Sequence, residues 1–258
     1  MLGPNHPSTL KAYNNLGGLY SDEGAFDKAE PLFRHCLEAT ERIFGSKHPD
    51  TLCTLGNLGR LCNIKGDHTQ AIAYISRCLE ASEQTLGPEH PDTLITIGNL
   101  ASVYSNMGDN ERAATLYIRC LGGQERTLGL DHPHTLITLG SLGMLYSEIG
   151  EYSRAEATYI RCLEAQNRLL GSSHPHTNVT RFSLANLLSE LERHSESISL
   201  RRAELDWCRE QNGDTDPGTL DSINGLAIDL RETGVLDEAE ALFRELLEAS
   251  RNVLEPSD

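Results

Sequence analysis

The chain has 258 residues, of which 38% are hydrophobic and 23% are charged, and its 22 basic and 38 acidic residues give a formal net charge of −16. Such an acidic excess argues against binding nucleic acid along most of the surface. The sequence has neither an apolar run long enough to span a bilayer nor an amino-terminal targeting segment. We therefore expect a cytoplasmic protein without a membrane partner.

One motif, Leu-Gly-x-x-His-Pro-x-Thr-Leu, returns every 42 residues from the start of the chain. Its histidines are His6, His48, His90, His132 and His174. A sixth copy keeps the same spacing with Asp216 in the histidine position, followed by Pro217, Thr219 and Leu220. A fixed period of 20 to 50 residues is typical of solenoids, in which each repeat buries its apolar face against its neighbours.

Each repeat is predicted to form two helices, because apolar residues recur at helical spacing and a glycine divides them. In the first repeat the helices cover about 8–21 and 26–44, with Gly24 at the turn and Leu16 on the apolar face of the first helix. The predicted fold is all-α: a single right-handed α-solenoid of six helix-turn-helix repeats. We place the repeats at about 9–44, 51–86, 93–128, 135–170, 177–212 and 219–254.

The repeat resembles the tetratricopeptide repeat. Leu16-Gly17 with Tyr20, followed by Ala29, Phe33 and Cys36, matches its Leu-Gly-x-x-Tyr and Ala-x-x-x-aromatic-x-x-small pattern. The longer repeat, the linkers at 86–93 and 128–133, and the segments Asn14-Asn15-Leu16-Gly17, Asn57-Leu58-Gly59 and Asn99-Leu100-Ala101 are similar to the kinesin light chain subfamily. The resemblance implies that Asn15, Asn57 and Asn99 lie in a peptide-binding groove, although they could equally bond the backbone of the preceding repeat.

Kinesin light chains are known for a basic groove that takes peptides with a tryptophan among acidic residues. This sequence departs from that pattern, because its groove positions include only Lys11, Arg60 and Arg231 as cations. It also has no seven-residue pattern for a coiled coil. Any contact with kinesin heavy chain or its cargo would therefore involve regions outside this chain. We interpret the chain as a fragment of a larger protein.

The cysteines and histidines are predicted to be structural. Cys36, Cys78, Cys120 and Cys162 occupy one position in successive repeats, where a small buried residue is expected. The repeated histidines are too far apart along the array to share one metal ion. Each precedes a proline that favours the first turn of a helix, so we expect a loop hydrogen bond there. We predict no metal and no cofactor.

No segment has the spacing of a nucleophile elbow or a phosphate-binding loop, so we predict that the chain is not an enzyme. Binding remains, and in stacked helix pairs the first helices line the concave face. The candidate peptide-binding residues on that face are Lys11, Asn14, Asn15, Asn57, Arg60, Asn63, Ile95, Asn99, Ser102, Asn106, Ile137, Met144, Val179, Phe182 and Asn186. Ile95, Ile137 and Val179 form an apolar row, which could alternatively pack against the neighbouring repeat.

Two places depart from the pattern. In the fifth repeat Glu192 replaces the turn glycine, and polar residues fill three core positions, so we expect its second helix to be rotated or shifted outward. These core replacements are Ser197, Arg201 and Glu204. They reflect either relaxed selection on one repeat or a partner site around Trp207, Arg201 and Arg202. Gly122-Gly123 is predicted to soften the second helix of the third repeat.

Two functional hypotheses follow. In the first, the chain is a non-enzymatic scaffold or adaptor that binds a peptide segment of a partner protein in its concave groove, with kinesin light chain-like cargo binding as the most specific version. In the second, it is a structural or regulatory arm of a multidomain signalling protein. The last helix, with the apolar residues Leu242, Phe243, Leu246 and Leu247, is the best candidate for self-association.

Overall fold

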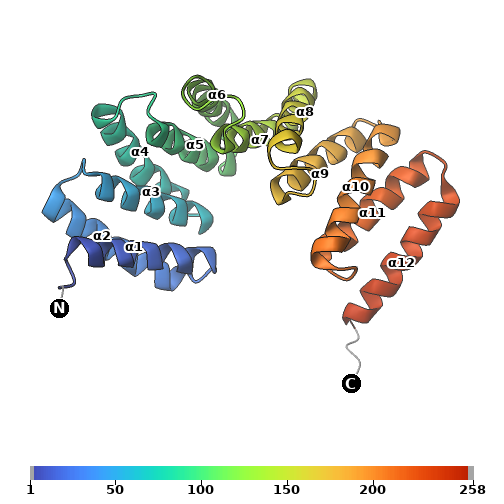
Figure 1. Ribbon diagram of the computed structural model, residues 1–258, viewed down its shortest axis with the longest axis horizontal. Helices are drawn as coiled ribbons and strands as arrows, with labels where there is room; N and C mark the ends of the chain where they lie inside the picture. The colour runs from blue at the N-terminus through green and yellow to red at the C-terminus, as the bar shows by residue number, and fades with distance from the viewer. Residues whose placement is uncertain (1–2, 255–258) are drawn as a thin grey trace. The chain divides into compact units, whose positions relative to one another are not determined.

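The computed structural model describes residues 3–254, with side chains for residues 3–250, and this part of the chain contains helices and no strand. The helices follow one another in pairs, as Figure 1 shows. The first helices of the pairs are α1 (Pro7–Asp22), α3 (Pro49–Ile64), α5 (Pro91–Asn106), α7 (Pro133–Glu148), α9 (Pro175–Glu190) and α11 (Pro217–Glu232). The second helices are α2 (Phe26–Phe44), α4 (His68–Thr85), α6 (Asn110–Thr127), α8 (Tyr152–Leu169), α10 (His194–Asn212) and α12 (Leu236–Leu254). The predicted all-α solenoid of helix-turn-helix repeats is confirmed.

The helices group into two compact units, and the boundary lies inside α7. Unit 1 extends to Ser141 and unit 2 begins at Leu142. No helix in the described part of the chain is both long and apolar enough to cross a membrane.

The repeated histidines cap the first helices. The Nδ1 atom of His48 accepts a hydrogen bond from the backbone N–H of Asp50 at 3.2 Å, and the proline between them begins the helix without an unpaired N–H. In the sixth repeat the Oδ1 atom of Asp216 accepts the equivalent bond from Gly218 at 2.9 Å. The predicted loop hydrogen bond of the motif histidine is therefore confirmed.

The turn inside each repeat uses left-handed backbone geometry. Gly24 has φ +73°, and glycines one repeat apart have similar values at this turn. In the fifth repeat Glu192 takes the same conformation at φ 59°, and it is the only non-glycine residue with positive φ among the described residues. Glycine adopts this conformation at little cost, whereas a glutamate is strained there.

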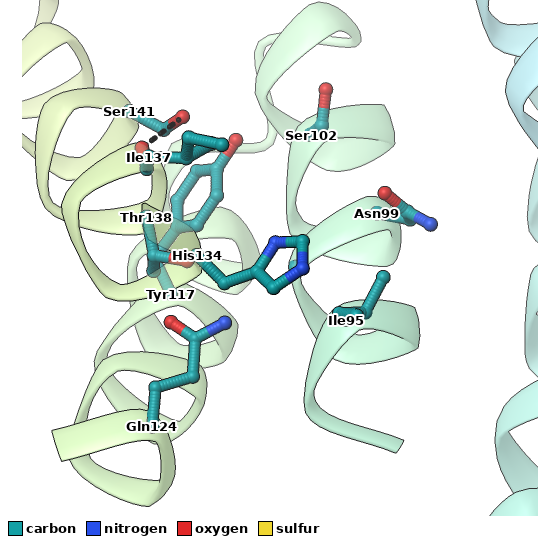
Figure 2. Close-up of a pocket in the computed structure, with 10 residues that line it drawn as sticks. Ile95, Asn99, Ser102, Tyr117, Gln124, His134, Ile137, Thr138 and Ser141 are labelled. Atoms are coloured by element: carbon teal, nitrogen blue, oxygen red, sulfur yellow. Dashed lines mark hydrogen bonds between the residues drawn. The ribbon is translucent and has the colours of Figure 1, made fainter. Parts of the chain in front are cut away.

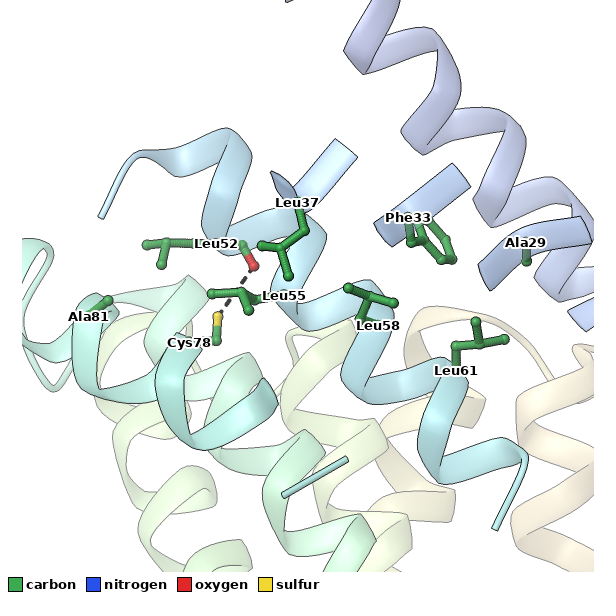
Figure 3. Packing of buried hydrophobic residues seen from close by; sticks show 9 residues of the cluster. All are labelled: Ala29, Phe33, Leu37, Leu52, Leu55, Leu58, Leu61, Cys78 and Ala81. Carbon is green, nitrogen blue, oxygen red and sulfur yellow. Dashed lines mark hydrogen bonds between the residues drawn. The ribbon is translucent and has the colours of Figure 1, made fainter. Parts of the chain in front are cut away.

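The core of unit 1 forms where a first helix lies between two second helices. Leu55, Leu58 and Leu61 of α3 are fully buried between Phe33 of α2 and Cys78 of α4 (Figure 3). Close approach depends on small residues. A Cβ atom at Gly17 would lie 2.8 Å from the ring of Phe33, so only glycine fits there.

The four cysteines that share one position in the repeat are buried, as predicted. Their thiols also contribute hydrogen bonds, because the Sγ atoms of Cys36, Cys78 and Cys120 each donate to a carbonyl of the preceding first helix. The acceptors are Leu10, Leu52 and Leu94. Burial raises the pKa of the Cys36 thiol to about 11, which keeps it protonated near neutral pH.

One expectation within unit 1 was wrong, and another remains untested. Leu16 is 38% exposed, whereas its counterpart Leu58 is fully buried, because Leu58 packs in the cluster that contains Phe33 of α2. The glycine pair lies inside α6, which runs unbroken from Asn110 to Thr127, and the softening of this helix stays a prediction. Gly123 is buried, and a Cβ atom there would overlap the side chain of Leu94, so close packing explains this glycine.

The expected outward shift of the second helix in the fifth repeat was also wrong. Ser197, Arg201 and Glu204 of α10 are buried in the same positions that apolar residues occupy elsewhere. Polar partners make this possible: the Nε atom of Arg201 donates to Asp229 at 2.6 Å, and Ser222 donates to Glu204 at 2.6 Å. The helix keeps its register because each of these polar side chains has a hydrogen-bond partner inside the core, although one carboxylate oxygen of Glu204 lacks one.

The proposed partner site around Trp207 therefore loses one of its members. Arg201 is buried, while Arg202 forms an ion pair with Glu238 at 2.6 Å. The indole N–H of Trp207 donates to the carbonyl of Ser173 at 2.6 Å. Arg202 and Trp207 therefore bind groups within unit 2, namely Glu238 of α12 and the carbonyl of Ser173, which precedes α9.

Candidate partner-binding face

The first helices of each unit form a surface that we call the first-helix face. In unit 1 it comprises α1, α3, α5 and the part of α7 up to Ser141. The candidate residues predicted on it are all at least partly accessible. Ile137 is 53% exposed, and Ile95 is half-buried. Ile95 and Ile137, the part of the apolar row that lies in unit 1, are therefore accessible to a ligand and are not buried against the neighbouring repeat.

A pocket of about 210 Å³ lies on this face between α5 and α7. Ile95, Asn99, Ser102 and Ile137, all candidates from the sequence, line it together with Gly98. Figure 2 shows the side chain of His134 pointing from α7 toward α5, across the space between the two helices. The lining contains apolar and neutral polar side chains and no carboxylate.

The deeper wall of the pocket comes from the second helix of the third repeat. Tyr117 and Gln124 of α6 are buried and line the pocket beside Thr138 and Ser141 of α7. The hydroxyl of Ser141 donates to the carbonyl of Ile137 at 3.1 Å. A wall of this kind offers hydrogen-bonding groups to a neutral polar ligand, as ligand sites usually do.

The sequence missed His134, Tyr117, Gln124, Thr138 and Ser141 as pocket residues. A signal was present for Ser141, which lies 42 residues after the candidate Asn99. His134 comes from the linker end of a first helix, Thr138 from a buried position of the same helix, and Tyr117 and Gln124 from a second helix. None of these four residues is a non-core residue in the body of a first helix, so the predicted positions did not include them.

The asparagines of α1 and α3 contact each other rather than the backbone of the preceding repeat. The Nδ2 atom of Asn57 donates to the Oδ1 atom of Asn14 at 3.3 Å, and Asn14 in turn donates to the Sγ atom of Cys53 at 3.5 Å. Lys11 and Asn15 are exposed beside them. This part of the face therefore presents a polar surface that already has internal hydrogen bonds.

A second polar chain follows the ends of α3 and α5. The Nδ2 atom of Asn106 donates to the Oδ1 atom of Asn63 at 3.1 Å, and Asn63 also contacts His68 at 3.1 Å. Arg60 pairs with Asp22 at 3.3 Å. One of the few cations on the face is thus already neutralised by a carboxylate of α1.

In unit 2 the first-helix face comprises the end of α7, α9 and α11. Val179 and Met144 are 58% and 51% exposed, and Phe182 and Asn186 are half-buried. Asn186 is partly engaged, because its Oδ1 atom accepts a hydrogen bond from the Nη2 atom of Arg201 at 2.9 Å. The apolar residues of α9 remain uncovered on this face.

A buried ionic network lies behind the face of unit 2. The Oδ1 atom of Asp229 accepts hydrogen bonds from Ser189 at 2.6 Å and from His194 at 2.8 Å, while its other oxygen pairs with Arg201. Burial would raise the pKa of this carboxyl, but these hydrogen bonds outweigh it and lower the pKa. Glu204 has the opposite balance, because burial raises its pKa.

The last helix uses most of its apolar residues inside unit 2. Leu242, Phe243 and Leu246 pack against the cluster that contains Leu230. Only Leu247 of the four predicted self-association residues is largely exposed.

Among the described residues no group of three or more His, Cys, Asp or Glu side chains is arranged to hold a metal ion.

Comparison with known proteins identifies the repeat. A sequence model of the tetratricopeptide repeat matches residues 8–74, 50–122, 96–168 and 176–252. No curated protein matches the chain in sequence.

Several solved structures share the fold. The nearly identical TPR-like repeats of a candidate kinesin light chain from Podosopora anserina have a TM-score of 0.71 at 23% identity, covering 81% of this chain and 99% of that chain. BtubC (BKLC) from P. vanneervenii has a TM-score of 0.72 at 18% identity, over 96% of this chain and 94% of that chain. The apo form of the quorum sensor NprR from B. thuringiensis has a TM-score of 0.68 at 15% identity, over 97% and 67% of the two chains.

Proposed function

The chain belongs to the tetratricopeptide repeat family, and on this premise we propose that it is a non-enzymatic adaptor that binds a peptide segment of a partner protein on its first-helix face. The observation that supports this function is the pocket between α5 and α7, where Ile95 and Ile137 lie beside neutral polar side chains. Apolar surface with a few placed polar groups suits a side chain of an extended peptide. The polar groups then satisfy the backbone of the ligand.

Kinesin light chain-like cargo binding is the finer version of this proposal. It is supported by the linkers and first-helix segments of the sequence, and the likeness to the Podosopora anserina structure concerns the fold. The scarcity of free cations on the face favours cargo other than acidic peptides, because Arg60 is already paired with Asp22. Contact with a motor would involve regions outside this chain.

The experiment places a photo-reactive amino acid, benzoylphenylalanine, at one of two matched positions in unit 1. Ile137 on α7 and Ile118 on α6 are 53% and 52% exposed, but only Ile137 lines the pocket. Irradiation in native extract is expected to crosslink a partner protein from position 137 and not from position 118. Equal crosslinking from both positions, or none from position 137, contradicts the proposed function.

A further inference from the structure

The first-helix face of unit 2 combines exposed apolar side chains with acidic ones. Val179 is 58% exposed on α9, Phe182 lies half-buried one turn further, and Asp221 is exposed on α11. Unit 2 as a whole has 22 acidic and 11 basic residues. A partner that covers Val179 must therefore also meet a strong negative potential.

The acidic residues at the ends of the first helices do not stabilise those helices. Glu148, Glu190 and Glu232 are the last residues of α7, α9 and α11, where the negative end of the helix dipole disfavours a carboxylate by roughly 0.3–1 kcal/mol each. Of the three, only Glu232 forms an ion pair, with Arg231 at 2.6 Å. Glu148 and Glu190 therefore destabilise their helices, and no ion pair within the described residues compensates for this.

The two unpaired glutamates act on one buried group behind the face, the hydroxyl of Tyr159 on α8. The ring of Tyr159 packs over Gly143, where a Cβ atom would be 2.7 Å away, and its hydroxyl hydrogen-bonds to Ser183 of α9. Burial, together with the negative charges of Glu148 and Glu190, raises the pKa of this hydroxyl to about 12. Both carboxylates therefore lie within electrostatic range of the buried Tyr159 hydroxyl, which α8 places against α7 and α9.

The cations near this face are already committed. Arg201 is buried and binds Asp229 and Asn186, and a Cβ atom at Gly225 would overlap its guanidinium group. Arg231 pairs with its neighbour Glu232. Among the described residues Glu190 and Asp221 have no ion-pair partner. The uncovered apolar surface is thus bordered by uncompensated negative charge.

We propose that the first-helix face of unit 2 binds a basic peptide segment of a partner protein. In this complex an aliphatic side chain covers Val179 and Phe182, and lysine or arginine side chains pair with Glu190 and Asp221. Charge complementarity of this kind sets partner choice and speeds association more than it adds affinity. The inference rests on the proposed function and names the chemical class of ligand that one of its faces accepts.

The test uses three pools of fluorescein-labelled nine-residue peptides and the whole chain. In every pool Leu, Ile or Val alternates with a variable residue, which is Lys or Arg, Asp or Glu, or Ser or Gln. Fluorescence anisotropy is expected to give at least tenfold tighter binding of the basic pool than of the acidic pool at 0.15 M salt. Binding of the basic pool should weaken about tenfold at 1 M salt, where charges are screened beyond about 3 Å.

Matched variants separate a local site from attraction to an acidic protein. The double variant Glu190→Gln/Asp221→Asn is expected to bind the basic pool about fivefold more weakly. The control Glu164→Gln/Glu210→Gln removes the same charge from exposed positions of the second helices α8 and α10, and should change the affinity less than twofold. Circular dichroism verifies that both variants remain helical.

The remaining outcomes contradict the inference in distinguishable ways. Equal losses in the two double variants would mean non-specific attraction and overturn it. Tightest binding of the acidic or the neutral pool, weakened by Val179→Ser, would overturn the basic ligand but retain the peptide-binding function. No binding of any pool would overturn both.

Discussion

At the scale of single residues, unit 2 depends on charges that are buried and paired. Asp229 is completely buried and receives hydrogen bonds from α9 and α10 through Ser189, His194 and Arg201. A buried ion pair adds little net stability, but removing one partner leaves the other charge uncompensated. The network therefore fixes α9, α10 and α11 relative to one another. Replacing any of its members should lower the stability of unit 2 substantially.

The variant Asp229→Asn should destabilise unit 2 by about 3 kcal/mol, because Arg201 then lacks its carboxylate partner. Urea unfolding followed by the fluorescence of Trp207, the single tryptophan of the chain, reports on α10 directly. The exposed variant Asp206→Asn on the same helix is the control and should change stability by less than about 0.5 kcal/mol. Equal effects would show that the network is unimportant for stability.

Glu204 gives a pH-dependent prediction. Burial raises its folded-state pKa above the unfolded value, so the folded chain holds this proton to higher pH. The stability of unit 2 should therefore fall as pH rises from the unfolded-state pKa through the folded-state pKa. Its Oε2 atom also lacks a hydrogen-bond partner.

The variant Glu204→Gln should remove this dependence and raise stability at pH 8 by about 1–3 kcal/mol, the range expected for one unsatisfied buried polar group. The gain should shrink near pH 4.5, where the wild-type carboxyl is protonated. The measurement is urea unfolding by Trp207 fluorescence at both pH values. A gain that is the same at both pH values would contradict the assigned role of the charge.

At the scale of helices, small residues determine how closely neighbouring helices pack. Capping side chains determine where the first helices begin. Gly59 and Gly56 lie on the same helix, α3, yet they differ in surroundings. A Cβ atom at Gly59 would overlap Ile75, whereas one at Gly56 meets nothing within 4 Å. The same residue type therefore has a packing role at one position and none at the other.

We expect Gly59→Ala to destabilise the chain by about 1–3 kcal/mol through overpacking. By contrast, Gly56→Ala should stabilise it by about 0.5–1 kcal/mol, because alanine is the better helix former. Thermal unfolding followed by circular dichroism distinguishes the two. The packing explanation would be wrong if both substitutions shifted the midpoint in the same direction.

The capping role of the motif histidine can be tested with the residue that replaces it in the sixth repeat. His90→Ala should cost about 1 kcal/mol, because the N–H of Asp92 loses its acceptor. His90→Asp should cost much less, since Asp216 caps α11 in the same way. Chemical denaturation of the two variants measures the difference, and equal costs would mean that the imidazole ring acts by another contact.

At the scale of the whole chain, periodicity predicted the helix pairs because one repeat pattern specifies both the turns and the core positions. Repetition also placed Cys78 and Ile137 correctly, one in the core and one on the surface. It failed for Arg201 and Glu204, because their partners Asp229 and Ser222 come from the next repeat. A pattern within one repeat does not indicate which polar residues will compensate one another across repeats.

The candidate site was predicted in part for a similar reason. Ile95 and Asn99 could be placed on a helix face from spacing alone, and the structure brings them to one pocket. His134 and Gln124 reach that pocket from a different repeat position and a different helix. Their contribution depends on side-chain direction between neighbouring helices, which the period of a single helix does not contain.

Partner binding to the first-helix face can be tested by a comparative pull-down from native extract. The baits are the wild type, Ile137→Asp in the pocket and Ile118→Asp on α6, two isoleucines of nearly equal exposure. We predict, by mass spectrometry, proteins retained by the wild type and by Ile118→Asp but lost from Ile137→Asp. If all three baits retain the same proteins, or none, the first-helix face of unit 1 is not the binding surface and the role as a structural or regulatory arm is favoured.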